Sequence, residues 1–125
     1  MFTQPKTDKP YEVRFLLYYI PSNLVTHEDK ARMPSMKEII NFVGSRPFRR
    51  KLDHAGGYQN LKIRPESVTD SSFCCHIAIY DCLVRQGFDC NTSATMMRAM
   101  HSLFVNIKDV IIYLYDILIT NHNYE

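Results

Sequence analysis

The sequence predicts an all-α fold, a bundle of about six or seven helices around a central apolar helix at residues 71–86. Read as a helix, the segment SSFCCHIAIYDCLVRQ carries apolar residues on nearly every side. A helix that is apolar all round must be surrounded by other parts of the protein. In addition, apolar residues in the segment 93–119 recur at alternating spacings of four and three, which is typical of an amphipathic helix.

Length and composition indicate one ordinary globular domain. The 125 residues suffice for a single core, and 46% of them are hydrophobic. We expect residues 1–10 to be a flexible leader without a secretory pattern, and residues 11–121 to be the domain. The net charge of +2 is nearly balanced, which removes the strongest electrostatic argument for a nucleic acid or membrane partner. No nucleic acid and no membrane anchor are therefore expected.

The first half of the chain contains one well-signalled helix. Residues 11–20 are rich in aromatic and β-branched side chains, and their periodicity leaves helix and strand unresolved. Residues 36–43 form the clearer pattern, because Ser35 and Glu38 make a capping box and Gly44 can end the helix.

The remaining segments are also interpreted as mainly helical. Pro47 stands near a plausible helix start within residues 45–55, and residues 58–63 form either a helical turn or a short strand. Residues 93–119 form one long helix, or two helices separated by a bend near residues 106–109.

The residues give little support for chemistry. Adjacent helical positions diverge by about 100°, so Cys74, Cys75 and His76 cannot converge on one metal ion. Asp53 and His54 could be half of a proton relay, but nothing in the sequence places a nucleophile beside them. Nucleotide-binding and hydrolase motifs are absent. We expect no catalytic residue, no metal, no cofactor and no enzyme activity.

One cluster of basic residues has two interpretations. Arg46, Arg49, Arg50 and Lys51 lie close together in the sequence, with Lys62 and Arg64 some way beyond them. Such a cluster can bind phosphate or an acidic partner. It can equally form the solvated side of a short helix, which is the interpretation we favour from sequence.

Three segments resemble the Bcl-2 family proteins of large DNA viruses, especially the small poxvirus members that lack a membrane anchor. They are YEVRFLLYYIPSN at the start of the domain, HIAIYDCLVRQG at residues 76–87, and MHSLFVNIKDVIIYLYDIL at residues 100–118. The resemblance implies a Bcl-2-like helical bundle. The sequence departs from the cellular family pattern, because TDSSFCCH replaces the Asn-Trp-Gly-Arg signature and its arginine.

The resemblance implies a viral protein that inhibits host cell apoptosis by sequestering the amphipathic death helix of pro-apoptotic proteins in a hydrophobic groove. The residues expected to line this groove are Met36, Ile39, Ile40, Val43, Phe48, Leu52, Phe73 and Ile77. Arg50 and Arg64 are expected to supply charge at the groove rim. The alternative is a non-enzymatic adaptor that docks on innate signalling proteins and suppresses NF-kappa-B signalling. A basic nucleic-acid-binding module is a distant third interpretation.

The resemblance also implies a homodimer in the host cell cytoplasm. The first helix and the penultimate helix carry more apolar residues than a helix needs to pack on its own core. The residues expected in the dimer interface are Phe15, Tyr18, Tyr19, Met97, Phe104 and Val105.

Overall fold

The protein has a mixed α/β fold, which corrects the expectation of an all-α bundle. The computed structural model describes residues 2–7, 9–44 and 46–122. The strands are β1 (Phe2–Lys6), β2 (Lys9–Leu16), β3 (Phe48–Asp53), β4 (Phe73–Cys74), β5 (Ile79–Tyr80), β6 (Val110–Tyr113) and β7 (Asp116–Asn121). The α-helices are α1 (Ile20–Val25), α2 (Met36–Val43) and α3 (Thr92–Phe104), and short 3-10 helices are η1 (Gly57–Asn60), η2 (Pro65–Ser67) and η3 (Thr69–Ser71).

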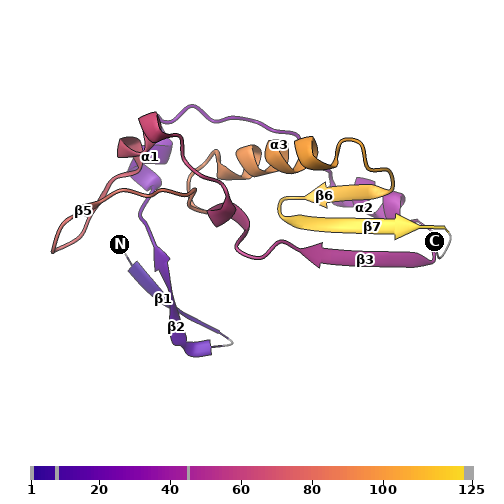
Figure 1. Cartoon of the computed structure of the whole chain (residues 1–125), viewed down its shortest axis with the longest axis horizontal. Coiled ribbons are helices and arrows are strands. Elements are labelled where there is room, and N and C mark those ends of the chain that lie inside the picture. Colours follow the sequence, from indigo (N-terminus) through magenta and orange to yellow (C-terminus); the bar gives the residue numbers. More distant parts are fainter. Residues whose placement is uncertain (1, 8, 45, 123–125) are drawn as a thin grey trace.

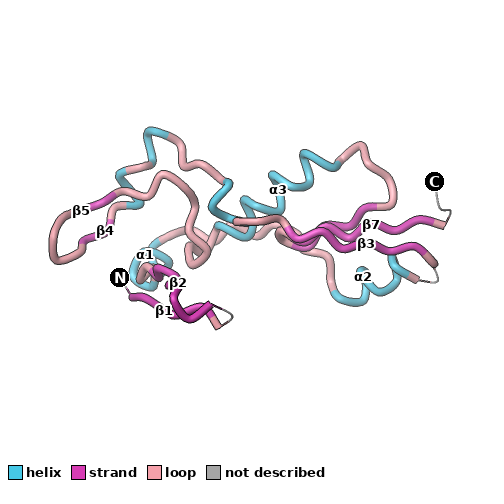
Figure 2. Tube along the Cα trace, turned by 60° about the horizontal axis from the view of Figure 1, so that its bottom comes forward, coloured by secondary structure: helices cyan, strands magenta, loops and turns pink. Residues whose placement is uncertain are grey.

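The centre of the fold is a three-stranded antiparallel sheet with α3 packed on one face. Its strand order is β3-β7-β6, so β7 lies in the middle. Figure 2 shows α3 on one side of this sheet and α2 on the other. The core lies between α3 and the sheet, and it consists of Met96, Met97, Met100, Ile112 and Ile117. Helix α3 therefore covers strands β6 and β7 on one face of the sheet.

The second half of the segment 93–119 forms a hairpin and not a helix. The helix ends at Phe104, and the β-branched and aromatic run VIIYLYDILITN forms β6 and β7. Residues of this kind pack well on a pleated, half-buried surface. Asp109 precedes β6 and Leu114 follows it, and they adopt positive φ angles of 62° and 57°. A right-handed α-helix cannot contain residues in this conformation. The expected bend near residues 106–109 is where the helix gives way to the sheet.

The segment 71–86 is not a central helix, so the principal sequence prediction is wrong here. It contains the end of η3 and the small antiparallel pair β4 and β5, and Cys82 is its one buried residue. Two hydrogen bonds involving the hydroxyl of Ser71 fix the end of the loop, because it accepts from the backbone N–H of Cys82 and donates to the carbonyl of the same residue. Several of its apolar residues are exposed, and Ile77 is 74% exposed.

The N-terminal region forms a separate hairpin of two strands. Strands β1 and β2 pair antiparallel from Phe2 opposite Leu16 to Lys6 opposite Lys9. The hairpin lies away from the β3-β7-β6 sheet (Figure 1). Residues 2–6, which we expected to be a flexible leader, are thus a strand, and Met1 and Asp8 lie outside the described residues.

The helix at residues 36–43 is confirmed, together with its capping box. Ser35 accepts a hydrogen bond from the backbone N–H of Glu38, and the Glu38 carboxylate accepts one from the N–H of Ser35. Gly44 follows the helix with a φ of 43°. The next expected helix, at residues 45–55, is replaced by β3. Residues 58–63 were expected to be a helical turn or a short strand, and they contain most of η1 and an isolated β-bridge from Lys62 to Val84.

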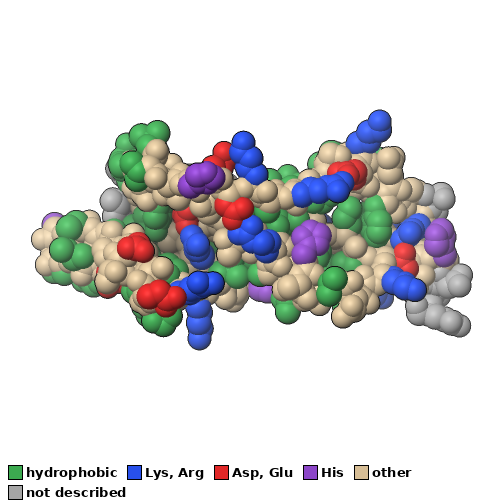
Figure 3. Space-filling model, turned by 90° about the horizontal axis from the view of Figure 1, so that it is seen from above, with side chains coloured by type: hydrophobic (Ala, Val, Ile, Leu, Met, Phe, Trp, Pro, Cys, Tyr) green, Lys and Arg blue, Asp and Glu red, His purple; other side chains and the backbone are tan. Residues whose placement is uncertain are grey.

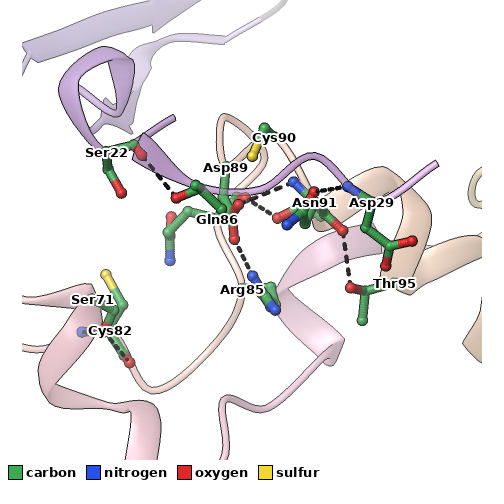
Figure 4. Close-up of polar contacts among 12 residues, drawn as sticks. Ser22, Asp29, Ser71, Cys82, Arg85, Gln86, Asp89, Cys90, Asn91 and Thr95 are labelled. Atoms are coloured by element: carbon green, nitrogen blue, oxygen red, sulfur yellow. Dashed lines mark hydrogen bonds and ion pairs between the residues drawn. The ribbon is translucent and has the colours of Figure 1, made fainter. Parts of the chain in front are cut away.

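A polar junction holds the start of α3 against the segment that precedes α2. Asn91 accepts a hydrogen bond from the backbone N–H of Asp29 and donates one to the carbonyl of His27. Asn23 accepts from the N–H of Cys90, and Arg85 pairs with Asp89 (Figure 4). Asn91 stands at the N-cap position of α3, but its side chain makes these contacts and does not cap the helix.

Within the described part of the chain, no helix is long and apolar enough to cross a membrane.

Candidate nucleic-acid interface

The two faces of the three-stranded sheet carry different side chains. Cross-strand neighbours point to the same face, so the register places Leu52, Ile117 and Ile112 together on the face that α3 covers. The opposite face carries Asp53, Asp116 and Tyr113 in one row, and Lys51, Leu118 and Ile111 in the next row. The charged side chains of Asp53, Asp116 and Lys51 therefore lie on the face of the sheet that α3 does not cover.

Asp53 and Asp116 form a cross-strand carboxylate pair at one end of this face. They lie directly opposite each other at the end of the β3–β7 register. The backbone N–H of the following residue, His54, donates to the carbonyl of Tyr115 at 3.1 Å, which makes the 53–116 pair a narrow, non-hydrogen-bonded one. In such pairs the Cα atoms are about 4.5 Å apart and the side chains are close. Like charges directly opposite each other are destabilising, so a cation beside the two aspartates stabilises the pair.

Lys51 supplies a positive charge to the carboxylate pair. Its Nζ atom lies 2.9 Å from Oδ2 of Asp116. The hydrogen bond and charge of Asp116 raise the pKa of Lys51, and Asp53 adds to this effect. The side chain of Lys51 is 63% exposed, so it can turn away when another cation competes for the carboxylates or when a phosphate competes for its ammonium group.

The turn between β6 and β7 places Asp116, and it contains a strained residue. Leu114 has a φ of 57°, and its backbone N–H donates to the sulfur of Met97 at 3.0 Å. Residues outside glycine that adopt this conformation are held by their surroundings and are frequent at functional sites. The ring of Tyr115 packs edge-on against Tyr58, with centroids 5.6 Å apart. The core and η1 thus fix the turn from two sides.

The basic residues of the sequence cluster have separate structural tasks. Arg46 donates to the hydroxyl of Thr120 at 2.6 Å, pairs with Asp109, and stacks on the Phe42 ring at 4.8 Å. Arg49 donates to the carbonyls of Arg46 and Gly44 and so holds the end of α2. Seen from the α3 side, acidic and basic side chains alternate with apolar ones (Figure 3). The surface in that view has no large region of one sign.

The residues expected to line a peptide groove do not meet around a central helix. Met36, Ile39, Ile40 and Val43 lie on α2, whereas Phe48 and Leu52 lie on β3. Phe73 stacks on Tyr80 in the small β4–β5 pair, with centroids 5.9 Å apart, and Ile77 lies in its turn. Arg50 lies on β3, whereas Arg64 precedes η2. The expected rim is therefore not formed as a unit.

The residues expected at a dimer interface are divided between core and surface. Met97 is 1% exposed and belongs to the core, and Phe104 packs against that core. Phe15 on β2, Tyr18 in the loop that follows it and Val105 directly after α3 are exposed. Tyr19 is half-buried beside Cys82, and this burial raises its pKa to about 12. These six residues do not make one surface.

Sequence reasoning noted Asp53 but missed its partner, Asp116. The signal was present in the two segments FRRKLD and YLYDIL, each of which has an apolar residue next to an aspartate. Interpreting both as helix separated the two aspartates, whereas interpreting both as strands would have allowed their pairing. Among the described residues, no group of three or more His, Cys, Asp or Glu side chains could hold a metal ion. At this site Asp53 and Asp116 could therefore supply two carboxylate ligands to a metal ion.

No family model matches the sequence. The fold is similar to that of the native prototype foamy virus protease-reverse transcriptase, with a TM-score of 0.80 and 22% identity over 97% of this chain. It is also similar to a foamy viral protease-reverse transcriptase in complex with an RNA/DNA hybrid, with a TM-score of 0.83 and 18% identity over 98% of this chain. A third structure is the dRH form with double-stranded DNA, with a TM-score of 0.81, 21% identity and 97% of this chain covered.

A curated protein is similar in sequence as well. The retrovirus-related Pol polyprotein from transposon 297 of Drosophila melanogaster is 27% identical over 119 residues, which is 93% of this chain. The chain spans 11% of that polyprotein, 16% of the native and hybrid-bound foamy virus chains, and 21% of the dRH chain. The chain thus has the fold of a segment found in larger reverse transcriptases.

These comparisons correct the interpretation based on viral Bcl-2 proteins. The similar proteins are a Pol polyprotein and reverse transcriptases, so the expected relationship and the expected roles in apoptosis or NF-kappa-B signalling are wrong. The expectation of a non-enzyme conflicts with the same proteins, which belong to enzyme families. The expectation of pro-apoptotic partners without nucleic acid conflicts with the complexes that hold an RNA/DNA hybrid and double-stranded DNA.

Proposed function

We propose that this chain is the nucleic-acid-binding region of a Pol-type protein with reverse transcriptase activity. Its substrate class is a nucleic acid duplex, held against the sheet face that carries Asp53, Lys51 and Asp116. The observation that carries the proposal is the fold match, with a TM-score of 0.83, to a reverse transcriptase in complex with an RNA/DNA hybrid. The register supports it independently, because it brings the two carboxylates together on the face that α3 does not cover.

The carboxylate pair suits one divalent cation. Polymerases use metal ions to stabilise attacking and leaving oxygens during phosphoryl transfer. Mg²⁺ is commonly bound by one or two protein carboxylates, with waters and substrate phosphates completing its coordination. Asp53 and Asp116 are the residues that would hold such an ion. In this proposal Lys51 neutralises the pair and also contacts a phosphate of the bound duplex.

Fluorescence anisotropy with a labelled RNA/DNA hybrid tests the proposal. Binding should weaken as salt increases, because phosphate contacts release counterions. Lys51→Gln should lower the slope of log affinity against log salt by about 0.9, the value for one phosphate contact. The matched control is Lys37→Gln, which removes the same charge from an exposed position on α2.

The outcomes are distinguishable. Equal slopes for the Lys51 variant, the Lys37 variant and the unmodified chain would show that the sheet face does not contact the duplex. Absence of hybrid binding at low salt would overturn the proposed function itself. Far-UV circular dichroism of each variant checks that the charge change has left the fold intact.

A further inference from the structure

A cavity lies where the segment before α2 separates from α3. Its volume is about 780 Å³, and its lining comes from residues 31–38, the second half of α3, the loop after it and strand β6. Asp29 holds the segment against α3 beside this cavity, through the side chains of Asn91 and Arg98. Volumes of about 300–1,000 Å³ are typical of sites that bind small molecules.

The deepest part of the cavity is apolar. Met97 and Ile112, which are 1% and 3% exposed, line it from the core. Phe104 lies on the same face of α3 as Met97, two turns further along the helix. Ile107 and Val105 line the outer part and are 52% and 74% exposed. An apolar molecule placed here would remove these side chains from water, which is favourable.

The ionisable side chains of the lining are mainly basic. They are Arg32, Arg98 and His101, with Glu38 as the one acid. Glu38 is already engaged, because it accepts from the backbone N–H of Ser35 and pairs with Arg32. The imidazole of His101 has no hydrogen-bond or ion-pair partner within the described part of the chain. The mouth of the cavity therefore suits an anionic group.

The combination of an apolar interior and a basic mouth selects among possible occupants. A cationic molecule would meet Arg98, one helical turn from His101 on α3. A nucleic acid strand would place its phosphates against exposed apolar groups such as Ile107. An uncharged apolar molecule would leave the imidazole without a partner. A molecule with one anionic end and one apolar chain satisfies both parts of the lining.

We propose that this cavity binds an alkyl carboxylate of medium chain length. The alkyl chain packs against Met97 and Ile112, and the carboxylate accepts hydrogen bonds from Arg98 and His101, the kind of charge-assisted bond that is stronger than a neutral one. The bound molecule contacts the segment before α2, helix α3 and strand β6 together. The proposal goes beyond nucleic acid binding and does not depend on it.

NMR of the methionine methyl groups tests the apolar part of the site, with decanoate as the probe. The signal of Met97 should shift, whereas Met96, which is 2% exposed but outside the lining, should shift less. Affinity should rise about fourfold for each CH₂ group added from hexanoate to decanoate. An unshifted Met97 signal at about 1 mM decanoate, the weak end of specific association, would overturn the proposal. Affinity that is independent of chain length would do the same.

Charge reversal at the mouth provides the second readout. His101→Glu should weaken decanoate binding about tenfold, the size expected for loss of one charge-assisted contact, and should leave decanol binding unchanged. The matched control is Ser102→Glu, which adds a negative charge at the next exposed residue, outside the lining. It should leave decanoate affinity unchanged. Equal weakening in both variants would refute the assignment of the carboxylate to His101.

A lipid surface is the competing source of the same chemistry. Vesicles of phosphatidylglycerol present anionic groups and acyl chains, but they do not supply a free acid to the cavity. If they shift the Met97 signal where decanoate does not, the proposal is wrong and this surface recognises a membrane. If decanoate alone shifts it, the site for a free alkyl carboxylate is supported.

Discussion

At the scale of single residues, Gly57 determines how closely η1 can approach the β6–β7 turn. It has a φ of 31°, and a Cβ atom at this position would lie 3.2 Å from Cδ1 of Tyr115. That tyrosine immediately precedes Asp116 of the carboxylate pair. The glycine thus couples the backbone of η1 to the geometry of the candidate site.

We expect Gly57→Ala to lower the free energy of unfolding by at least about 1 kcal/mol, because alanine is strained at positive φ. Chemical denaturation measures the loss. The matched control is Gly87→Ala, which would also contact a tyrosine ring at 3.2 Å but has no positive φ. If both variants lose the same stability, backbone strain at Gly57 is not the cause.

A second prediction at this scale concerns the ion pair between Asp29 and Arg98. The hydrogen bond from Arg98 holds the pKa of Asp29 below its usual range. Since the native pKa is depressed, the pair favours the folded state above the unfolded value of about 3.9, and this contribution is lost as pH falls through the native pKa. Arg98→Gln should raise the pKa of Asp29, as measured by NMR titration.

The control for this titration is Arg32→Gln. The pKa of Glu38 is lowered first by the backbone hydrogen bond of Ser35 and then by the side chain of Arg32. The control should raise the pKa of Glu38 and leave that of Asp29 unchanged. A shift of Asp29 in the control would mean that general surface charge, and not the direct pair, sets its pKa.

At the scale of elements, α2 depends on its cap because none of its residues is buried. We expect Ser35→Ala to destabilise the protein by about 1 kcal/mol, since it removes the acceptor for the N–H of Glu38. Thermal unfolding measures the change. Ser102→Ala, in the last turn of α3, removes an exposed hydroxyl without a capping role and should cost less than about 0.5 kcal/mol. Equal losses would show that the capping box is not formed in solution.

The sequence predicted elements well only where local chemistry decided the structure. The capping box of α2 is local, and it was identified correctly with both bounds. Residues 110–119 were assigned to the helix predicted over residues 93–119, because alternating apolar rows fit the helical period. The β-branched residues and the positive φ of Leu114 instead make them part of a hairpin. Strand pairing depends on distant partners, and a single sequence does not display it.

The candidate site was hidden for the same reason. Asp53 was noted as a possible member of a proton relay, but its role in the candidate site depends on Asp116, which lies opposite it on the neighbouring strand β7. The apolar segment 71–86 led to a different error, because burial was predicted where the structure has an exposed loop. Its cysteines and isoleucines suggested burial on all sides, whereas hydrogen bonds of Ser71 and the short β4–β5 pair hold it as an exposed loop.

At the scale of the whole molecule, the chain exposes more surface than a compact protein of its size. The accessible surface is 9876 Å², whereas a compact monomer of this mass exposes about 6,900 Å². The elongated arrangement in Figure 1 agrees with this excess, since the β1–β2 hairpin lies apart from the α3-covered sheet. Large exposed apolar groups, among them Tyr11 and Leu24, belong to the same excess. Such surfaces are typical of regions that contact other macromolecules.

The central claim is that the sheet face carrying Asp53, Lys51 and Asp116 binds a nucleic acid duplex. The most direct measurement is an NMR map of backbone amide shifts when an unlabelled RNA/DNA hybrid is added to the labelled chain. The account predicts that the largest changes occur at those three residues and their neighbours on β3 and β7, with small changes on α1. Changes concentrated elsewhere, or none at saturating hybrid, would contradict it.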